Sequence, residues 1–190
     1  LTYSKPKRLN QHSMDKQQIR AKIRQLKRQH TTEELCALSR KAAESLLKRI
    51  HQEENCHTVL LYHSLSDEVQ THSLIQALAA EGKTVLLPTI VGDELELHEY
   101  IGEESFSLSQ SFGIQESTGP LFTRYSQIDL AIIPGVAFTA QGERLGRGKG
   151  FYDRLLPKLQ CPLIGLAYPF QIIDFIPCEP HDIRMTEIVY

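Results

Sequence analysis

The chain has 190 residues, of which 41% are hydrophobic and 23% charged, and its formal net charge is −2. This composition is typical of a globular domain with a buried core and excludes a disordered chain. No apolar run approaches the roughly 18 residues that a membrane helix needs, so a membrane-spanning protein is excluded as well.

The N-terminal segment is polar, and we expect residues 1–12 to form an irregular extension, with Met14 as a candidate natural start. Residues 13–190 are expected to form a single domain. Ser13 is a good N-cap for the first helix. Three cations of that helix fall in one sector beside its apolar stripe, where they would reach a neighbouring cleft: Lys16, Arg20 and Lys27.

The next hundred residues predict two further helices and three strands. Thr31 and Glu34 have the spacing of a capping box and begin the second helix. A short helix is predicted over residues 71–81, followed by Gly82, a usual residue just past a helix end. Apolar or alternating runs predict the strands: residues 58–63, residues 84–88 with Pro88 as the end, and residues 94–100 as an edge strand.

The second half is predicted to begin with a long surface excursion over residues 102–127. Buried strands are expected at 129–134 and 162–168, a helix at 151–159, and a closing strand in the tail. Short apolar strands that alternate with helices predict an α/β domain with a mostly parallel sheet covered on both faces. Because ligands of such sheets bind beyond the carboxyl ends of the strands, the loops after 58–63, 129–134 and 162–168 are the candidate site.

The most informative segment is the Gly-rich loop, residues 142–150. Its four glycines let backbone N–H groups surround an anion, and the N-terminus of a helix follows. The spacing matches neither a Walker A loop nor a dinucleotide-binding fingerprint. A polyphosphate site therefore stands beside two alternatives, a surface loop and an RGG-like contact with nucleic acid.

Charge is distributed in a way that favours a small anion. Residues 1–50 hold 13 Lys and Arg against 4 Asp and Glu, whereas residues 51–190 hold 8 against 19. Four of these 8 cations fall between Arg144 and Arg154. Two basic spots on an acidic body can focus a small anionic ligand without attracting nucleic acid to the whole surface.

Several acidic residues could serve the same site. Asp153, directly after the Gly-rich loop, could hold Mg²⁺ or only stabilise the first turn of a helix. Asp182 could be a second metal ligand or a turn residue. Asp67 and Glu68 could bind a heterocycle or be a solvated pair. His63, at a strand end, could likewise serve the site or have no functional role.

The four cysteines show no metal-type spacing and predict reduced thiols in a cytoplasmic protein.

The stretch PGVAFTAQGERLGRGKGFYDRLL (residues 134–156) resembles the signature of the 5-formyltetrahydrofolate cyclo-ligase family. The similarity extends from about Met14 to the end of the chain. Three shorter motifs occur in the expected order: Lys16 with Arg20, Asp67-Glu68 and Pro180-His181-Asp182. The resemblance implies a three-layer α/β/α domain. It also implies Mg²⁺- and ATP-dependent cyclisation of 5-formyltetrahydrofolate to 5,10-methenyltetrahydrofolate, with release of ADP and phosphate.

The resemblance also implies roles for individual residues. ATP would be bound by Lys16, Arg20, Arg144, Leu145, Gly146, Arg147, Gly148, Lys149, Gly150, Phe151 and Tyr152. The folate would be bound by His63, Glu68, Arg147 and Tyr152, and the metal by Asp153 and Asp182. The catalytic residues would be Arg147, Lys149 and Tyr152. Phe151 stands where a tyrosine is common in the family, so a hydroxyl role at that position is lost.

The expected partners are therefore a small folate substrate and ATP, bound by a monomer, with no nucleic acid and no membrane. Two alternatives stay open. A relative of the same fold could bind nucleotide or RNA without catalysis, and steeply salt-dependent oligonucleotide binding would mark it. An enzyme of similar layers could act on a phosphorylated sugar, and independence of ATP would mark that reading.

Overall fold

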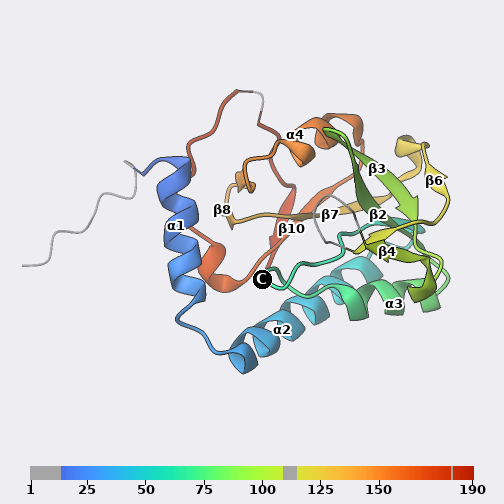
Figure 1. The fold of residues 1–190 in the computed structure, drawn as a ribbon, viewed down its shortest axis with the longest axis horizontal. Helices are drawn as coiled ribbons and strands as arrows, with labels where there is room; N and C mark the ends of the chain where they lie inside the picture. The colour runs from blue at the N-terminus through green and yellow to red at the C-terminus, as the bar shows by residue number, and fades with distance from the viewer. Residues whose placement is uncertain (1–13, 109–114, 181) are drawn as a thin grey trace, which may run out of the picture.

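The computed structural model describes residues 14–108, 115–180 and 182–190. A seven-stranded sheet forms its centre (Figure 1), in the order β11-β10-β7-β1-β2-β3-β6. The first five strands in this order run parallel, and β3 and β6 each run antiparallel to the neighbour before them. The strands span Thr58–Leu60 (β1), Thr84–Val91 (β2), Glu94–Glu99 (β3), Leu121–Phe122 (β6), Leu130–Pro134 (β7), Leu163–Leu166 (β10) and Glu187–Val189 (β11). The predicted mostly parallel sheet is confirmed.

Helices cover both faces of this sheet and give the expected three layers. On one face lie α2 (Thr32–His51) and α3 (His72–Ala80), which bury Leu46, Ile50 and Leu78 against the strands. On the other face lie α4 (Phe151–Leu155) and the 3-10 turn after it, which bury Leu155 and Leu156. Burial of these apolar faces is the main stabilising contribution to such a domain.

Helix α1 (Lys16–Lys27) lies beside one end of the sheet (Figure 1). It packs Ile19 and Ile23 against a short ribbon of β8 (Ala137–Phe138) and β9 (Arg144–Leu145). Asp15, not Ser13, is its N-cap, with a complete capping box to Gln18. Ser13 and the predicted extension lie outside the described residues.

The capping box that begins α2 is confirmed. The Thr31 hydroxyl accepts from the Glu34 N–H at 3.2 Å, and the Glu34 carboxylate accepts from the Thr31 N–H at 2.8 Å. Helix α3 ends as predicted, with Gly82 at φ +81° just beyond it.

The prediction that Pro88 ends a strand is wrong, because β2 continues to Val91. The N–H of Ile90, two residues on, points away from β3 and donates to Glu116. The backbone N–H groups of successive strand residues point to alternate sides of the strand. The nitrogen of Pro88, which carries no hydrogen, therefore lies on the same side as the N–H of Ile90. There β1 has already ended, at Leu60 opposite Leu86, so the proline breaks no bond of the sheet.

Two further expectations need correction. Strand β3 alternates as predicted, with Leu95 and Leu97 buried, but it is not the edge, since β6 pairs beyond it. The excursion over 102–127 contains regular structure: β4 (Phe106–Leu108) and β5 (Gln115–Ser117) form an antiparallel ribbon, and β6 joins the sheet. Residues 109–114 lie outside the described part. Among the described residues no helix is long and apolar enough to cross a membrane.

Candidate functional site

A cavity of about 270 Å³ opens where β1 and β7 end at their carboxyl ends. The Gly-rich loop forms one side and strands β2 and β3 another. The cavity is lined by Tyr62, His63, Leu65, Glu68, Pro88, Ile90, Leu95, Glu116, Pro134, Gly135, Arg144, Gly146, Arg147, Gly148, Lys149, Gly150, Phe151, Tyr152 and Asp153. The cavity therefore lies at the loops predicted after 58–63 and 129–134, whereas the loop predicted after 162–168 does not line it.

The backbone of the Gly-rich loop is held by α1. Arg20 donates from Nε to the Gly146 carbonyl at 2.9 Å, and Leu145 is buried in the cluster that contains Ile19 and Ile23. Gly148 and Gly150 have φ of +96° and +74°, values that side chains other than glycine rarely adopt. The loop thus presents its backbone in a fixed and unusual shape that a substitution at either glycine would disturb.

Arg147 bridges the two acids of the loop after β1. Its Nη2 donates to Asp67 Oδ1 at 2.5 Å and to Glu68 Oε1 at 3.0 Å, and its Nε donates to the same Glu68 oxygen at 3.2 Å. Burial alone would raise the pKa of Asp67, but the hydrogen bond and charge of Arg147, together with the charge of Lys27, lower that pKa below its usual value. These predicted residues are brought together.

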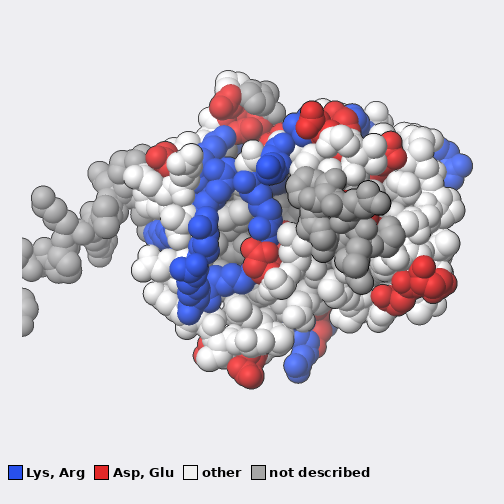
Figure 2. Space-filling view, viewed as in Figure 1, with Lys and Arg blue, Asp and Glu red and all other residues white. Residues whose placement is uncertain are grey.

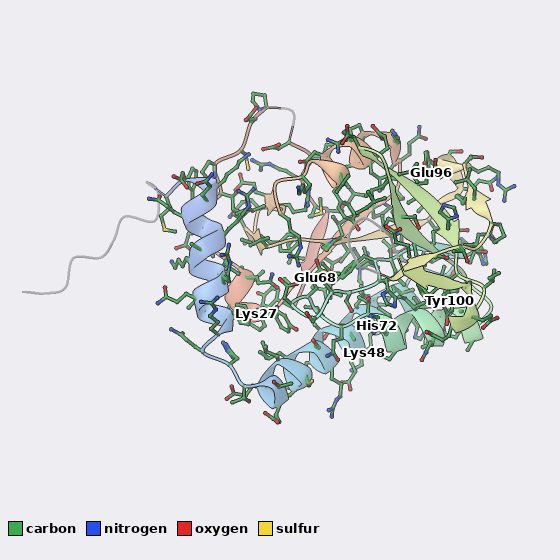
Figure 3. The ribbon with its side chains drawn as sticks, in the orientation of Figure 1. Lys27, Lys48, Glu68, His72, Glu96 and Tyr100 are labelled. Carbon is green, nitrogen blue, oxygen red and sulfur yellow. The ribbon has the colours of Figure 1, made fainter. Side chains whose placement is uncertain are left out.

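Lys27 belongs to the same charged group. Figure 3 shows it at the end of α1, beside Glu68. Its ammonium lies 5.2 Å from the centre of the Tyr168 ring, and burial lowers its pKa. Figure 2 shows the wider setting, with Lys and Arg side chains gathered along α1 and in a second band beside it.

Arg144 is the most buried cation of the site, with 6% of its side chain exposed. It donates to Asp153 at 2.6 Å and to the Pro134 carbonyl at 3.3 Å, and its guanidinium lies 5.6 Å from the centre of the Tyr152 ring. Burial raises the pKa of the Tyr152 hydroxyl far above its usual value, as it does for Tyr62. Both phenols therefore stay protonated and can donate, but they cannot act as bases near neutral pH.

His63 lines the cavity between two other rings. It stacks on His72 with ring centres 4.0 Å apart and tilts against Phe106 at 4.6 Å. Burial, followed by the charge of His72, lowers the pKa of His63 to about 4. Near neutral pH it is an uncharged, partly apolar wall for a ligand.

Five residues predicted for the site do not line the cavity: Lys16, Arg20, Asp67, Leu145 and Asp182. Arg20 and Leu145 fix the loop from outside. Lys16 forms an ion pair with Asp182 at 3.6 Å, and Asp182 also accepts from the Glu179 N–H at 2.8 Å. His181, between Pro180 and Asp182, lies outside the described residues.

The acidic residues do not form a ready cation site. Within residues 14–108, 115–180 and 182–190, no three His, Cys, Asp or Glu side chains gather to hold a metal. Asp153 is the predicted metal residue that lines the cavity, and 60% of its side chain is exposed. One carboxylate beside bound phosphates suffices for Mg²⁺, which keeps several waters, so Asp153 fits the role. All four cysteines are free thiols.

Sequence reasoning missed much of the cavity wall opposite the loop. Tyr62 and Leu65 directly follow β1, so the strand-end rule could have found them. Pro88 and Ile90 lie in β2, Leu95 lies near the start of β3, and Glu116 comes from the excursion. No local pattern marks these four residues.

Comparison with known proteins gives one consistent result. The family model described as 5-formyltetrahydrofolate cyclo-ligase matches residues 12–190. The 5-formyltetrahydrofolate cyclo-ligase of Haemophilus influenzae is 30% identical, over 94% of this chain and 98% of its own length, and that of Mus musculus is 27% identical over 92% and 93%. The solved 5,10-methenyltetrahydrofolate synthetase of Aquifex aeolicus superposes with a TM-score of 0.80 at 31% identity, over 93% of this chain and 89% of that one.

Proposed function

This chain belongs to the 5-formyltetrahydrofolate cyclo-ligase family, and we propose that its cavity converts 5-formyltetrahydrofolate to 5,10-methenyltetrahydrofolate, using ATP and Mg²⁺ and releasing ADP and phosphate. One observation supports this most directly. A Gly-rich loop with three cations and a wall of apolar side chains face the same cavity. Such a space suits a polyphosphate beside a flat, partly apolar ring system.

The proposed reaction has two steps. The formyl oxygen of the folate attacks the γ-phosphorus of ATP, the bond to ADP breaks, and a phosphorylated formyl group forms. N10 then attacks the formyl carbon and loses its proton, the C–O bond breaks, and phosphate leaves. The protein must hold both substrates in line and neutralise the charge of the transferred group, since no protein nucleophile takes part.

The residues of the loop divide these tasks. Arg147 and Lys149 would neutralise the charge of the phosphoryl group. Arg144 would hold the end of the loop that faces the nucleotide. The backbone N–H groups around Gly148 and Gly150 would donate to the remaining phosphate oxygens, and the Lys16 and Arg20 side chains would fix or extend this surface from α1. Mg²⁺ would be held by Asp153 and would supply charge neutralisation to the phosphates.

The folate side is formed by residues of other elements. Tyr152, protonated, and His63, neutral, would contact the ring system, and Glu68 borders it through its pair with Arg147. A cytoplasmic setting accords with the four free thiols.

The experiment follows the absorbance of the methenyl product with purified protein, 5-formyltetrahydrofolate and Mg²⁺, with and without ATP. Product that forms only with ATP supports the proposal. Lys149→Ala should lower kcat/KM at least 100-fold, because removal of one preorganised charge at a transition state has effects of about 10²–10³. Lys48→Ala, an exposed lysine on α2, is the matched control. Folded wild-type protein that makes no product would refute the proposal, and retained nucleotide or RNA binding would then identify a non-catalytic relative.

A further inference from the structure

Three carboxylates line the cavity, Glu68, Glu116 and Asp153, and Asp153 is paired with Arg144. The other two differ in which oxygens already accept hydrogen bonds. Glu68 uses both oxygens: Oε1 accepts twice from Arg147, and Oε2 accepts from the Leu65 N–H at 3.0 Å. Glu116 accepts through Oε1 from the Ile90 N–H at 3.2 Å. Among the described residues, no Lys or Arg forms an ion pair with Glu116, and its Oε2 receives no hydrogen bond.

The position of Glu116 follows from the sheet. Strand β1 ends opposite Leu86, so the edge of β2 beyond that point faces no strand. The ribbon of β4 and β5 covers this edge instead: Thr89 donates from its hydroxyl to the Ser117 carbonyl at 3.2 Å, and Ile90 donates to Glu116. One oxygen of Glu116 is thereby fixed to the backbone, and the side chain is held at the cavity wall.

The neighbours of Glu116 in the cavity are apolar. Pro88, Ile90 and Leu95 form this part of the wall, which we call the apolar wall, and the cations lie on the Gly-rich loop. One oxygen of Glu116 is held by the backbone and the other is free to accept, so this part of the cavity suits a ligand that presents a donor beside an apolar face. A flat heterocycle that carries an amino group supplies both an apolar face and that donor.

We propose that Glu116 is a substrate-binding residue, whose carboxylate accepts a hydrogen bond from the exocyclic amino group of the pterin ring while the ring packs on the apolar wall. This inference rests on the proposed function, since it assumes a reduced folate in the cavity. It places recognition of the heterocycle on Glu116, with Glu68 kept for orienting Arg147. Glu116 makes no bond to the reacting atoms and takes no part in phosphoryl transfer.

The decisive variant is Glu116→Gln. Glutamine keeps the size of the side chain and can still accept from the Ile90 N–H, but it loses the charge. Hydrogen bonds to charged groups are the stronger class, so KM for 5-formyltetrahydrofolate should rise about 10- to 100-fold, with the Kd of ATP changed less than twofold. Glu104→Gln removes an exposed carboxylate of the same excursion outside the cavity and should leave KM unchanged.

A purely structural role for Glu116 makes a different prediction. Since glutamine preserves the bond to Ile90, that role predicts a KM like the wild type, and this result would overturn the inference. A substrate analogue that lacks the exocyclic amino group gives a second measurement. It should bind wild type and Glu116→Gln with Kd values within threefold of each other, whereas a full 10-fold difference would assign the effect to something other than this hydrogen bond.

The inference and the proposed function fail in different ways. If wild-type protein makes no methenyl product, the proposed function fails first. If wild-type protein is active and Glu116→Gln is indistinguishable from it, only the role of Glu116 is refuted. Should Glu116→Gln not fold, as judged by lost ATP binding, Glu116→Asp keeps the charge on a shorter side chain. An unchanged KM in this second variant would overturn the inference, because the shorter carboxylate could no longer reach the amino group as the glutamate does.

Discussion

Arg147→Lys separates the chemical role of this side chain from its structural one. Arginine bridges Asp67 and Glu68 through three hydrogen bonds of 2.5–3.2 Å, whereas lysine keeps the charge but lacks the planar fork that makes such a bridge. Because 45% of the Arg147 side chain is exposed, the ion pairs should contribute about 1 kcal/mol or less to stability. For a chain of this length that loss lowers Tm by about 2–4 °C.

The expected loss of activity is much larger. A misplaced cation at the transferred phosphoryl group should lower kcat/KM about 100-fold, which corresponds to about 2.7 kcal/mol. Thermal unfolding and the absorbance assay for the methenyl product measure the two effects on the same sample. A fall in kcat/KM of only fivefold or less would show that Arg147 serves the fold of the loop and would refute its role in the reaction.

Three further outcomes are expected. Gly150→Ala should destabilise the protein by about 1–2 kcal/mol and weaken ATP binding in calorimetry, because φ is +74° and the new Cβ would lie 2.6 Å from Arg154 Nη1. For His63 the pKa is about 4 when folded and near 6.5 when unfolded, so the unfolded chain takes up the proton first and stability falls as pH falls from about 6.5 to 4; His63→Gln should flatten that part of a urea-unfolding series. Thr31→Ala removes one half of the capping box with Glu34 and should cost about 1 kcal/mol, visible as a lower Tm with unchanged KM.

The local rules predicted those parts of the fold that local sequence controls. The capping box of Thr31 and Glu34 and the helix end at Gly82 are set by residues within one turn, and both predictions are confirmed. The apolar runs located the buried strands for the same reason. The prediction that the strand ends at Pro88 failed because a proline breaks a strand only where its nitrogen faces a paired neighbour. The neighbour on that side, β1, already ends at Leu60, opposite Leu86, which local sequence does not reveal.

The candidate site likewise has a part that local sequence predicts and a part that only tertiary packing brings together. The Gly-rich loop is contiguous in sequence, so its glycines and cations could be predicted as one candidate anion site before any fold was known. The apolar wall and Glu116 could not, since strands β2 and β3 and the ribbon of β4 and β5 meet the loop only through tertiary packing. For Asp182 the motif predicts a metal ligand, whereas the structure shows its side chain paired with Lys16 and not lining the cavity.

The charge pairs of the candidate site show how an acidic body can hold cations in place for the proposed phosphate site. Arg144 is paired with Asp153, and Arg147 with Asp67 and Glu68, so each guanidinium is fixed along one edge before a ligand arrives. A guanidinium has five N–H donors, and a carboxylate that engages two or three of them leaves the others oriented instead of mobile. The carboxylates therefore neutralise part of the positive charge. They also reduce the conformational entropy that is lost on ligand binding, because the long side chains are already ordered. For Arg147 this exchange depends on pairing across the two loops, which the counts of charged residues along the sequence do not reveal.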